Sequence, residues 1–282
     1  MIKEIKAFAA DIDMTLSGKG GALPEVTVEA FRILREHNIP LGLATGREIE
    51  EHLKKQGAFW ELGYEFDFLV GLNGGMIYNL ADGYEWNIDM MRTDEMKEIL
   101  YHMLPLIDER KIAVNVEGGG NHNAMHFDSE AVSFFKRHGF ILEDCTGDVE
   151  KFCSKPCYKI LFRGKLEDEP FVRSRFNEVF ADKYDMVSTF PGTIEVIPKG
   201  VNKGNGLKRW AEHVGIDIAD IITFGDNEND NAMLKMSGWG VALKDGAQKT
   251  RDIADDVTDY GCEEGGVGHY LIDYYLKPKG WI

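Results

Sequence analysis

The chain has 282 residues, 44% of them hydrophobic, which is enough for one large domain or two ordinary ones with a substantial core. Its 48 acidic residues outnumber its 32 basic residues and give a net charge of −16, which argues against a surface for nucleic acid or anionic membranes, because basic patches supply the affinity there. No apolar stretch approaches the roughly 18 residues that a membrane helix needs, and no signal peptide precedes the first predicted strand, so we expect a cytoplasmic protein with neither a nucleic-acid nor a membrane partner.

The first part of the chain alternates predicted strands with predicted helices. An apolar run from Ile5 to Ala10 ends abruptly in Asp11 and Asp13, and a short apolar run of this kind indicates a buried strand. The elements that follow are an amphipathic helix around 28–34, strands at 41–44 and 66–70, and a helix from about Glu48 between those strands. This alternation is typical of a parallel, doubly wound sheet.

From about Gly83 to Phe190 the pattern changes, and we expect an inserted domain. Its predicted strands lie at 84–88, 112–116, 158–162 and 186–189, and its predicted helices at 93–107, 129–138 and 167–180. These elements are enough for a separate α+β domain. We therefore expect residues 83–190 to form the inserted domain, and residues 1–82 and 191–282 to form the core.

The first pattern resumes after the insertion. We expect a strand at 193–197, a helix at 203–213, a strand at 221–224, a helix at 231–236, a strand at 239–243 and a closing helix near 271–275. The predicted fold class is therefore α/β, with a doubly wound, Rossmann-like parallel-sheet core and an inserted α+β domain.

Four polar clusters each follow a strand of the predicted core sheet or begin one of its helices. They are Asp11 with Asp13, Thr45, Lys203, and Asp226 with Asn229 and Asp230. In a parallel sheet the carboxyl ends of the strands share one edge, so we expect the four clusters to converge there. Asp11 and Asp13 come directly after the carboxyl end of a buried strand, where unpaired carboxylates are costly. We therefore expect them to bind a cation, to act as acids or bases, or both.

An oxygen cluster of this kind suits Mg²⁺, which takes one or two carboxylates and keeps several waters and substrate phosphate oxygens as ligands. Lys203 and the hydroxyl of Thr45 would then hold the other oxygens of a phosphoryl group. Phosphoryl transfer requires positioning together with neutralisation of charge. The four clusters therefore predict phosphoryl-transfer chemistry, and the acidic net charge does not forbid a small anionic substrate.

Taken in order, these motifs resemble the haloacid dehalogenase (HAD) superfamily of phosphatases. The residues concerned are Asp11-Ile12-Asp13-Met14-Thr15, Thr45-Gly46-Arg47, Lys203 and Gly225-Asp226-Asn227-Glu228-Asn229-Asp230. A large insertion between the second and third motifs is similar to the Cof-type branch, which carries an α/β cap there and acts mostly on sugar phosphates and related small phosphate esters. Two further stretches resemble motifs of that branch, Asn73-Gly74-Gly75 and Ile197-Pro198-Lys199-Gly200-Val201-Asn202-Lys203-Gly204.

The resemblance implies a role for each residue. Asp11 would be the nucleophile that forms an aspartyl-phosphate intermediate, and Asp13 would protonate the leaving alcohol and then take a proton from the attacking water. Thr45 and Lys203 would complete the catalytic set. The implied Mg²⁺ ligands are Asp11, the backbone carbonyl of Asp13, Asp226, Asn229 and Asp230, and the implied phosphate-binding residues are Thr45, Gly46, Arg47, Asn73 and Lys203. The implied function is a Mg²⁺-dependent phosphatase for small phosphorylated metabolites, with residues 83–190 as the cap that selects the substrate.

Two other functions stay open on the sequence alone. A phosphomutase or phosphotransferase would use the same site with another acceptor, and a non-catalytic phospholigand-binding protein would keep the site without turnover. Arg47 could instead lie on the surface without contacting the substrate. Asp230 could have no role beyond capping the helix that follows it. The oligomeric state leaves no signal in the sequence.

Some motifs lie outside this scheme. His122 with His126, and Cys153 with Cys157, have spacings open to metal or redox roles, although a glycine-rich loop and reduced structural thiols are the simpler interpretations. Where the Cof-type branch often carries Met-Gly-Asn-Ala, this chain has Leu243-Lys244-Asp245-Gly246-Ala247, which puts any substrate contact there in doubt.

Overall fold

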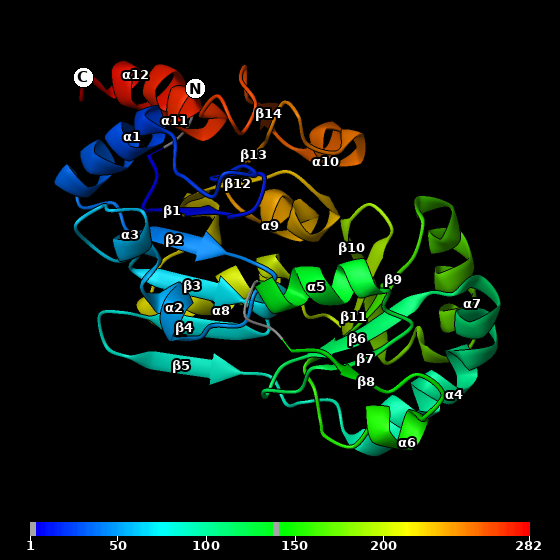
Figure 1. Cartoon of the computed structure of the whole chain (residues 1–282). Coiled ribbons are helices and arrows are strands. Elements are labelled where there is room, and N and C mark those ends of the chain that lie inside the picture. The colour runs from blue at the N-terminus through cyan, green and yellow to red at the C-terminus, as the bar shows by residue number, and fades with distance from the viewer. Residues whose placement is uncertain (1–3, 138–140) are drawn as a thin grey trace. The chain divides into compact units, whose positions relative to one another are not determined.

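The computed structural model describes residues 4–137 and 141–282. It divides the chain into two compact units, which are described separately: the core unit, Met1–Asn87 with Val201–Ile282, and the inserted unit, Ile88–Gly200 (Figure 1). Both boundaries fall later in the chain than the expected 82/83 and 190/191. No helix in the described segments is both long enough and apolar enough to cross a membrane.

The core unit is built on an eight-stranded sheet in the order β14-β13-β12-β1-β2-β3-β4-β5. Six strands are parallel neighbours: β1 (Ala7–Ala10), β2 (Leu41–Ala44), β3 (Phe68–Gly71), β12 (Ile221–Gly225), β13 (Trp239–Ala242) and β14 (Asp256–Val257). The chain runs outward from β1 through β2 to β3, and later returns with β12 to the other side of β1. The prediction of a doubly wound parallel sheet is confirmed, and the strand order reverses between β1 and β12.

Two antiparallel strands extend one edge of this sheet. β4 (Met76–Asn79) pairs with β3, and β5 (Tyr84–Asn87) pairs with β4. β4 was not predicted, and the prediction that the strand at 84–88 lies in the inserted domain is wrong, because β5 belongs to the core sheet. The residues of β5 alternate between half-buried and exposed, and such alternation shows that a strand has one covered face without showing which sheet it joins.

Helices cover both faces of the core sheet (Figure 1). On one face α1 (Glu25–Glu36), α11 (Gly266–Leu271) and the π-helical turn η5 (Ile272–Leu276) bury an apolar layer that includes Phe8, Phe31 and Phe224. On the other face α8 (Lys203–Val214) and α9 (Asn231–Met236) bury a layer that includes Phe68 and Trp210. The short elements are α2 (Glu51–Lys54), α3 (Gln56–Phe59), η1 (Leu72–Gly74), η3 (Ile218–Asp220), η4 (Glu228–Asp230), α10 (Gln248–Ile253) and α12 (Lys277–Lys279).

The inserted unit has its own six-stranded sheet in the order β10-β11-β9-β6-β7-β8. The strands are β6 (Ala113–Glu117), β7 (Asn123–Met125), β8 (Glu143–Asp144), β9 (Lys159–Arg163), β10 (Tyr184–Phe190) and β11 (Thr193–Pro198), all antiparallel to their neighbours except β7 and β8. Its helices are α4 (Thr93–Arg110), α5 (Ser129–Arg137), α6 (Val149–Phe152), the turn η2 (Leu166–Asp168) and α7 (Glu169–Phe180). Residues of α4 and α7 share one apolar layer with the sheet. The helix expected at 129–138 corresponds to α5, and the last residue of the expected range lies outside the described residues.

The strand at 193–197 was expected to resume the core sheet, and this expectation is wrong. β11 forms a hairpin with β10 and also pairs with β9, so it belongs to the inserted unit. The connection turns at Gly192, whose φ of +78° is the left-handed conformation that glycine adopts without strain. β11 is almost fully buried and mostly apolar, and the sequence of such a strand does not distinguish a parallel core strand from the centre of an antiparallel sheet.

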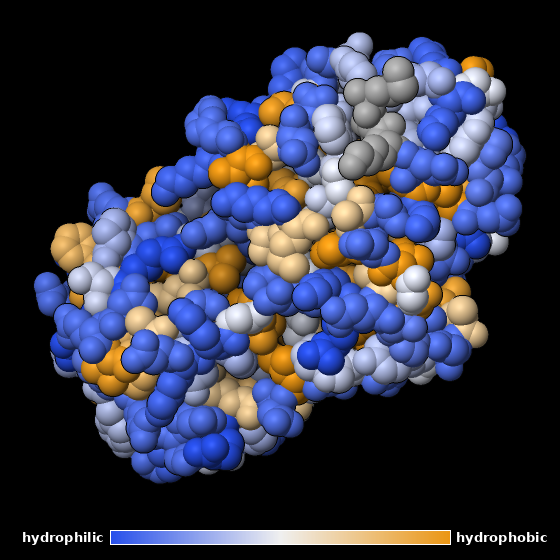
Figure 2. Space-filling view, turned by 180° about the vertical axis from the view of Figure 1, so that it is seen from behind, coloured by the Kyte–Doolittle hydropathy of each residue, from blue (hydrophilic) through white to orange (hydrophobic). Residues whose placement is uncertain are grey.

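The molecular face in Figure 2 is mostly hydrophilic, with hydrophobic residues in scattered patches. This distribution is ordinary for a folded chain, since apolar atoms contribute a large share of any protein surface.

Close packing inside the core sheet generates a stability prediction at Gly42 in β2. A Cβ atom on Gly42 would lie 2.1 Å from the ring of Phe68, and that ring cannot retreat because it stacks on Trp210 with the two centroids 3.4 Å apart. We expect Gly42→Ala to lower the free energy of unfolding by about 1–3 kcal/mol, measured by urea denaturation. Gly20→Ala is the matched control, because no atom lies within 4 Å of a Cβ there; equal stabilities for the two variants would contradict the packing.

Candidate active site

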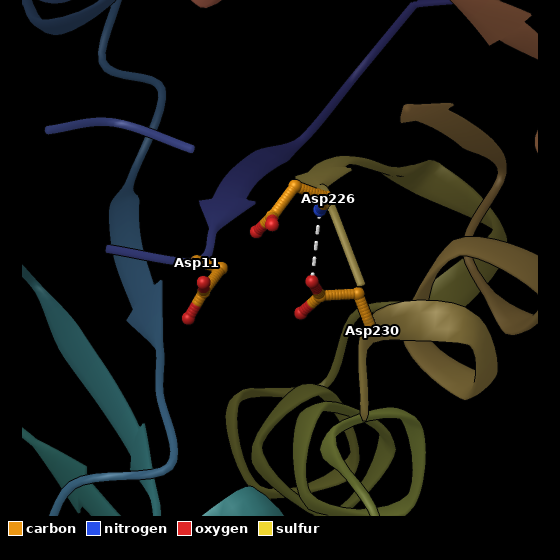
Figure 3. A group of neighbouring side chains, drawn as sticks. All are labelled: Asp11, Asp226 and Asp230. Carbon is orange, nitrogen blue, oxygen red and sulfur yellow. Dashed lines mark hydrogen bonds between the residues drawn. The ribbon is translucent and has the colours of Figure 1, made fainter. Parts of the chain in front are cut away.

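Three carboxylates meet at the carboxyl edge of the core sheet (Figure 3). Asp11 follows β1, Asp226 follows β12, and these strands are parallel neighbours. Asp230 ends the turn η4 and leads into α9. One oxygen from each of the three side chains lies within 4.8 Å of the others. The convergence follows from the reversal of strand order between β1 and β12, because two loops diverge from that point and leave room between them.

The turn after β12 is closed by the carboxylate of Asp230. One of its oxygens, Oδ2, accepts hydrogen bonds from the backbone N–H groups of Asp226 at 2.9 Å and Asn227 at 3.1 Å. A Cβ on Gly225 would lie 2.4 Å from the side chain of Asp230, so the close approach of strand and carboxylate requires glycine there. Asp230 thus shapes its own loop with one oxygen and presents the other to the site.

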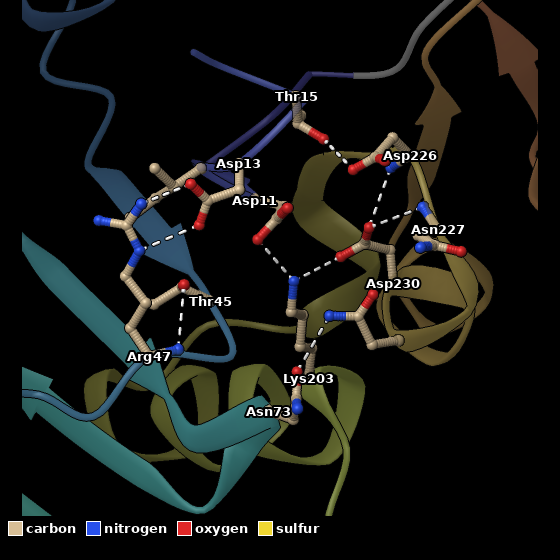
Figure 4. A network of polar contacts seen from close by, with 12 residues as sticks. Asp11, Asp13, Thr15, Thr45, Arg47, Asn73, Lys203, Asp226, Asn227 and Asp230 are labelled. Atoms are coloured by element: carbon tan, nitrogen blue, oxygen red, sulfur yellow. Dashed lines mark hydrogen bonds and ion pairs between the residues drawn. The ribbon is translucent and has the colours of Figure 1, made fainter. Parts of the chain in front are cut away.

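Lys203 stands between two of the carboxylates (Figure 4). It is the first residue of α8, its side chain is fully buried, and its Nζ donates to Asp11 Oδ1 and to Asp230 Oδ1, both at 2.7 Å. Burial alone would lower the pKa of the Lys203 ammonium, but the carboxylates of Asp11 and Asp230 outweigh it and hold that pKa above its ordinary value. Lys203 is therefore a permanent buried cation.

One ammonium does not balance three carboxylates in a buried place. Burial raises the pKa of Asp226 to about 8, and repulsion from Asp230 and Asp11 adds to the effect. Burial also raises the pKa of Asp11 to about 7, although the charge of Lys203 opposes the shift. The hydroxyl of Thr15 donates to Asp226 Oδ1 at 2.9 Å and helps to fix that carboxylate. When its carboxylates are ionised, the site therefore has an excess of negative charge that a bound cation would offset.

Asp13, two residues after Asp11, has a different environment. Its side chain is 42% exposed and is held by Arg47, whose Nε donates to Asp13 Oδ2 at 3.0 Å while Nη2 donates to Oδ1 (Figure 4). Arg47 comes from the loop after β2, where buried Thr45 accepts a hydrogen bond from the Arg47 backbone N–H at 3.2 Å. Arg47 was expected to bind phosphate. In this structure its side chain lies at the site and contacts Asp13.

Asn73 and Asn229 contact each other across the site. Asn229 Nδ2 donates to Asn73 Oδ1 at 3.1 Å, and the Asn73 backbone N–H donates to the carbonyl of Thr45 at 3.0 Å. Leu72, Asn73 and Gly74 all have positive φ angles, of 48°, 53° and 100°. A Cβ on Gly74 would lie 2.0 Å from the carbonyl oxygen of Asn202 at the start of α8, so this turn packs directly on that helix.

The sequence analysis assigned no role to some residues that support the site. Thr15 was quoted within the first motif, and its contact with Asp226 joins segments 211 positions apart that no local pattern connects. The backbone N–H of Ala247 donates to the carbonyl of Asp226 at 2.7 Å, so the loop after β13 supports the site through its main chain. The carboxylate of Asp245 in that loop accepts from the backbone N–H of Cys262.

The histidines and cysteines set aside above lie in the inserted unit. His126 Nε2 lies 3.0 Å from Asp108 Oδ1, and Cys153 and Cys157 are fully buried in the apolar layer. Burial raises the pKa of the Cys153 thiol to about 12, which disfavours a reactive thiolate.

Comparison with known proteins agrees with this geometry. A family model described as haloacid dehalogenase-like hydrolase matches residues 8–271. The 5-amino-6-(5-phospho-D-ribitylamino)uracil phosphatase YitU of Bacillus subtilis is 26% identical over 281 residues, covering 95% of this chain and 96% of YitU. The HMP-PP phosphatase of Klebsiella pneumoniae is 28% identical over 275 residues, covering 97% of each chain.

A solved structure with the same fold is that of BT4131, described as a HAD subclass IIB sugar phosphatase. It has a TM-score of 0.78 and 21% identity, and the match covers 98% of this chain and 100% of BT4131. The family match spans almost the whole chain and includes all the polar clusters at the sheet edge. The chain therefore belongs to the haloacid dehalogenase-like hydrolases, as a phosphatase of the Cof-type branch.

Proposed function

We propose that this chain is a Mg²⁺-dependent phosphatase that hydrolyses small phosphate monoesters, sugar phosphates among them, through an aspartyl-phosphate intermediate. The observation that carries the proposal is the meeting of Asp11, Asp226 and Asp230 around the buried ammonium of Lys203 at the carboxyl edge of a parallel sheet. Negative charge for a metal and positive charge for a phosphoryl group thus lie side by side.

The donor set fits a magnesium ion. The three carboxylates offer hard oxygen ligands close together, and burial raises the pKa of two of them, so a divalent cation would stabilise their ionised forms. Asp11, Asp226 and Asp230 would hold or orient the ion, with the backbone carbonyl of Asp13 and the side chain of Asn229 as further ligands. When bound, the ion supplies positive charge that neutralises phosphoryl oxygens during transfer.

Asp11 is the nucleophile in this proposal. One oxygen of its carboxylate attacks phosphorus, the bond from phosphorus to the leaving oxygen breaks, and the aspartyl-phosphate forms. Asp13 gives its proton to the departing alkoxide. A water then attacks the phosphorus of the intermediate and gives a proton to Asp13, which releases inorganic phosphate and restores Asp11.

The remaining residues hold the phosphoryl group. Lys203 is fixed beside Asp11 and meets the transferring oxygens without rearranging its two ion pairs. Thr45 and Gly46 provide the hydroxyl and backbone of the loop after β2, which is tied to Asn73 through the Thr45 carbonyl. Arg47 and Asn73 complete the proposed phosphate-binding set.

The substrate is proposed only as a class. The names of the similar proteins specify a phosphoribitylamino-uracil, HMP-PP and a sugar phosphate as substrates, and these compounds have little in common beyond being small and phosphorylated. We assign the choice among such compounds to the inserted unit, acting as a cap, because the residues proposed for chemistry all belong to the core unit.

The nucleophile assignment is tested by Asp11→Asn. We expect kcat for p-nitrophenyl phosphate with Mg²⁺ to fall by roughly 10⁴-fold or more, because the amide is not a nucleophile. The fold should persist, since the amide oxygen can still accept from Lys203. The matched control is Asp252→Asn at an exposed position of α10, which should keep its rate, and normal phosphate release by Asp11→Asn would refute the mechanism.

The metal assignment is tested by stability without any turnover. Because the pKa values of Asp11 and Asp226 in the folded chain are raised from 3.8, the folded state binds protons more tightly than the unfolded state. Without a divalent ion, the stabilisation from these protonated acids is complete below the unfolded pKa and is lost as the pH rises towards 7 to 8. Mg²⁺ binds the ionised forms, so we expect it to raise Tm more at about pH 8.5 than at about pH 5.5.

The control for this measurement is Asp226→Asn, in which the Mg²⁺-induced gain in Tm should largely disappear at the higher pH. Asp252→Asn should keep the full gain. An equal rise of Tm in the wild type and in Asp226→Asn would show that the ion binds elsewhere.

A further inference from the structure

The two cations of the site are held in opposite ways. Lys203 is fully buried and fixed by two carboxylates, whereas the side chain of Arg47 is 41% exposed and contacts one partner, Asp13, that is itself 42% exposed. An ion pair between exposed groups contributes little to stability, and a long exposed side chain has room to move. Arg47 can therefore change its partner at low cost, and Lys203 cannot.

The contact between Arg47 and Asp13 occupies both oxygens of the carboxylate. Nε donates to Oδ2 and Nη2 donates to Oδ1, so one planar guanidinium makes a bidentate contact with both oxygens of the carboxylate (Figure 4). The proposed mechanism needs an oxygen of Asp13 at the leaving group and then at a water. In the observed arrangement both of these oxygens accept hydrogen bonds from Arg47, and a cation favours the ionised form of a carboxylate that it contacts, so Asp13 must leave Arg47 before it can donate a proton.

A phosphate group offers the same recognition geometry as the carboxylate. The guanidinium fork matches two oxygens of either group, and a phosphate dianion carries more negative charge than a carboxylate. A phosphoryl group held beside Lys203 at Asp11 would enter the neighbourhood of Arg47, because Asp11 and Asp13 are separated by a single residue.

We propose that Arg47 is an exchangeable latch: its guanidinium holds Asp13 while the site is empty and transfers to the phosphoryl oxygens when the substrate binds, which releases Asp13 for its work. This inference rests on the proposed function. The alternative arrangement is a static clamp, in which Arg47 stays on Asp13 throughout and has no contact with phosphate.

The latch makes a prediction that the static clamp does not. If Asp13 and phosphate compete for one guanidinium, removing the charge of Asp13 strengthens phosphate binding more while Arg47 is present than in its absence. The removal of a nearby negative charge would by itself favour an anion in any background, so the presence and absence of Arg47 must be compared.

The experiment is a double-mutant cycle on the binding of inorganic phosphate, measured by calorimetry on the full chain with Mg²⁺. Its four proteins are the wild type, Asp13→Asn, Arg47→Ala and the double variant. We expect Asp13→Asn to lower Kd about threefold to fivefold, the value of one exposed ion pair. Arg47→Ala should raise Kd by about tenfold or more, the value of a charge-assisted hydrogen bond. In the Arg47→Ala background, Asp13→Asn should change Kd by less than about twofold, because only the weak repulsion between the exposed Asp13 and the anion is then removed.

A matched ion pair serves as the control. Arg35 Nη1 lies 2.8 Å from Asp67 Oδ2, with side chains 32% and 34% exposed, at the amino end of β3 rather than its carboxyl end. Arg35→Ala should leave phosphate binding unchanged, and thermal unfolding of each variant checks its fold.

The outcomes separate the latch from the function on which it rests. A gain from Asp13→Asn that is equal with and without Arg47 overturns the latch while leaving the phosphatase proposal in place. Unchanged phosphate binding in Arg47→Ala overturns it as well and favours the static clamp. No phosphate binding by the wild type in the presence of Mg²⁺ overturns the proposed function and the latch together.

Discussion

The bonds from the Lys203 ammonium to Asp11 and Asp230 are the interaction on which the rest of the site depends. Each of these charges is buried, and removing one partner of such a group typically costs about 3–5 kcal/mol because the other is left without compensation. The three residues come from the end of β1, the start of α8 and the turn before α9. One ion-paired cluster therefore requires three distant segments to meet, and the same meeting produces the local excess of negative charge beside Asp226.

Away from that centre the polar side chains of the site have fewer partners and are more exposed to solvent. The carboxylate of Asp226 is held by Thr15, and its backbone by the loop after β13, whereas Asp13 and Arg47 are half-exposed and bound mainly to each other. The groups assigned to the metal and to the nucleophile are thus buried and held by several partners, whereas the groups assigned to proton transfer and to substrate capture are half-exposed and held mainly by one another. This division suits a reaction in which charge must be positioned in advance while a proton carrier meets successive partners.

The features of this fold that could be predicted are those that a short stretch of sequence determines. Buried parallel strands appear as short apolar runs, so β1, β2 and β12 could be located and the convergence of Asp11 with Asp226 followed from the sheet class. The membership of β5 and β11 could not be derived, because strand pairing is a long-range choice that the residues of one strand do not specify. The contacts of Arg47 with Asp13 and of Asn229 with Asn73 also escaped prediction, since a motif names residue types and leaves open which polar groups pair with one another.

The placement of β12 beside β1 has a consequence for biosynthesis. β1 is synthesised before the whole inserted unit, but its neighbour on one side, β12, is synthesised after that unit. A nascent chain therefore carries a half-built sheet whose central strand has an open edge, the kind of edge that invites mispairing. The inserted unit is contiguous and has its own sheet, so its synthesis separates the two halves of the core sheet in time, and the open edge of β1 persists until β12 is made.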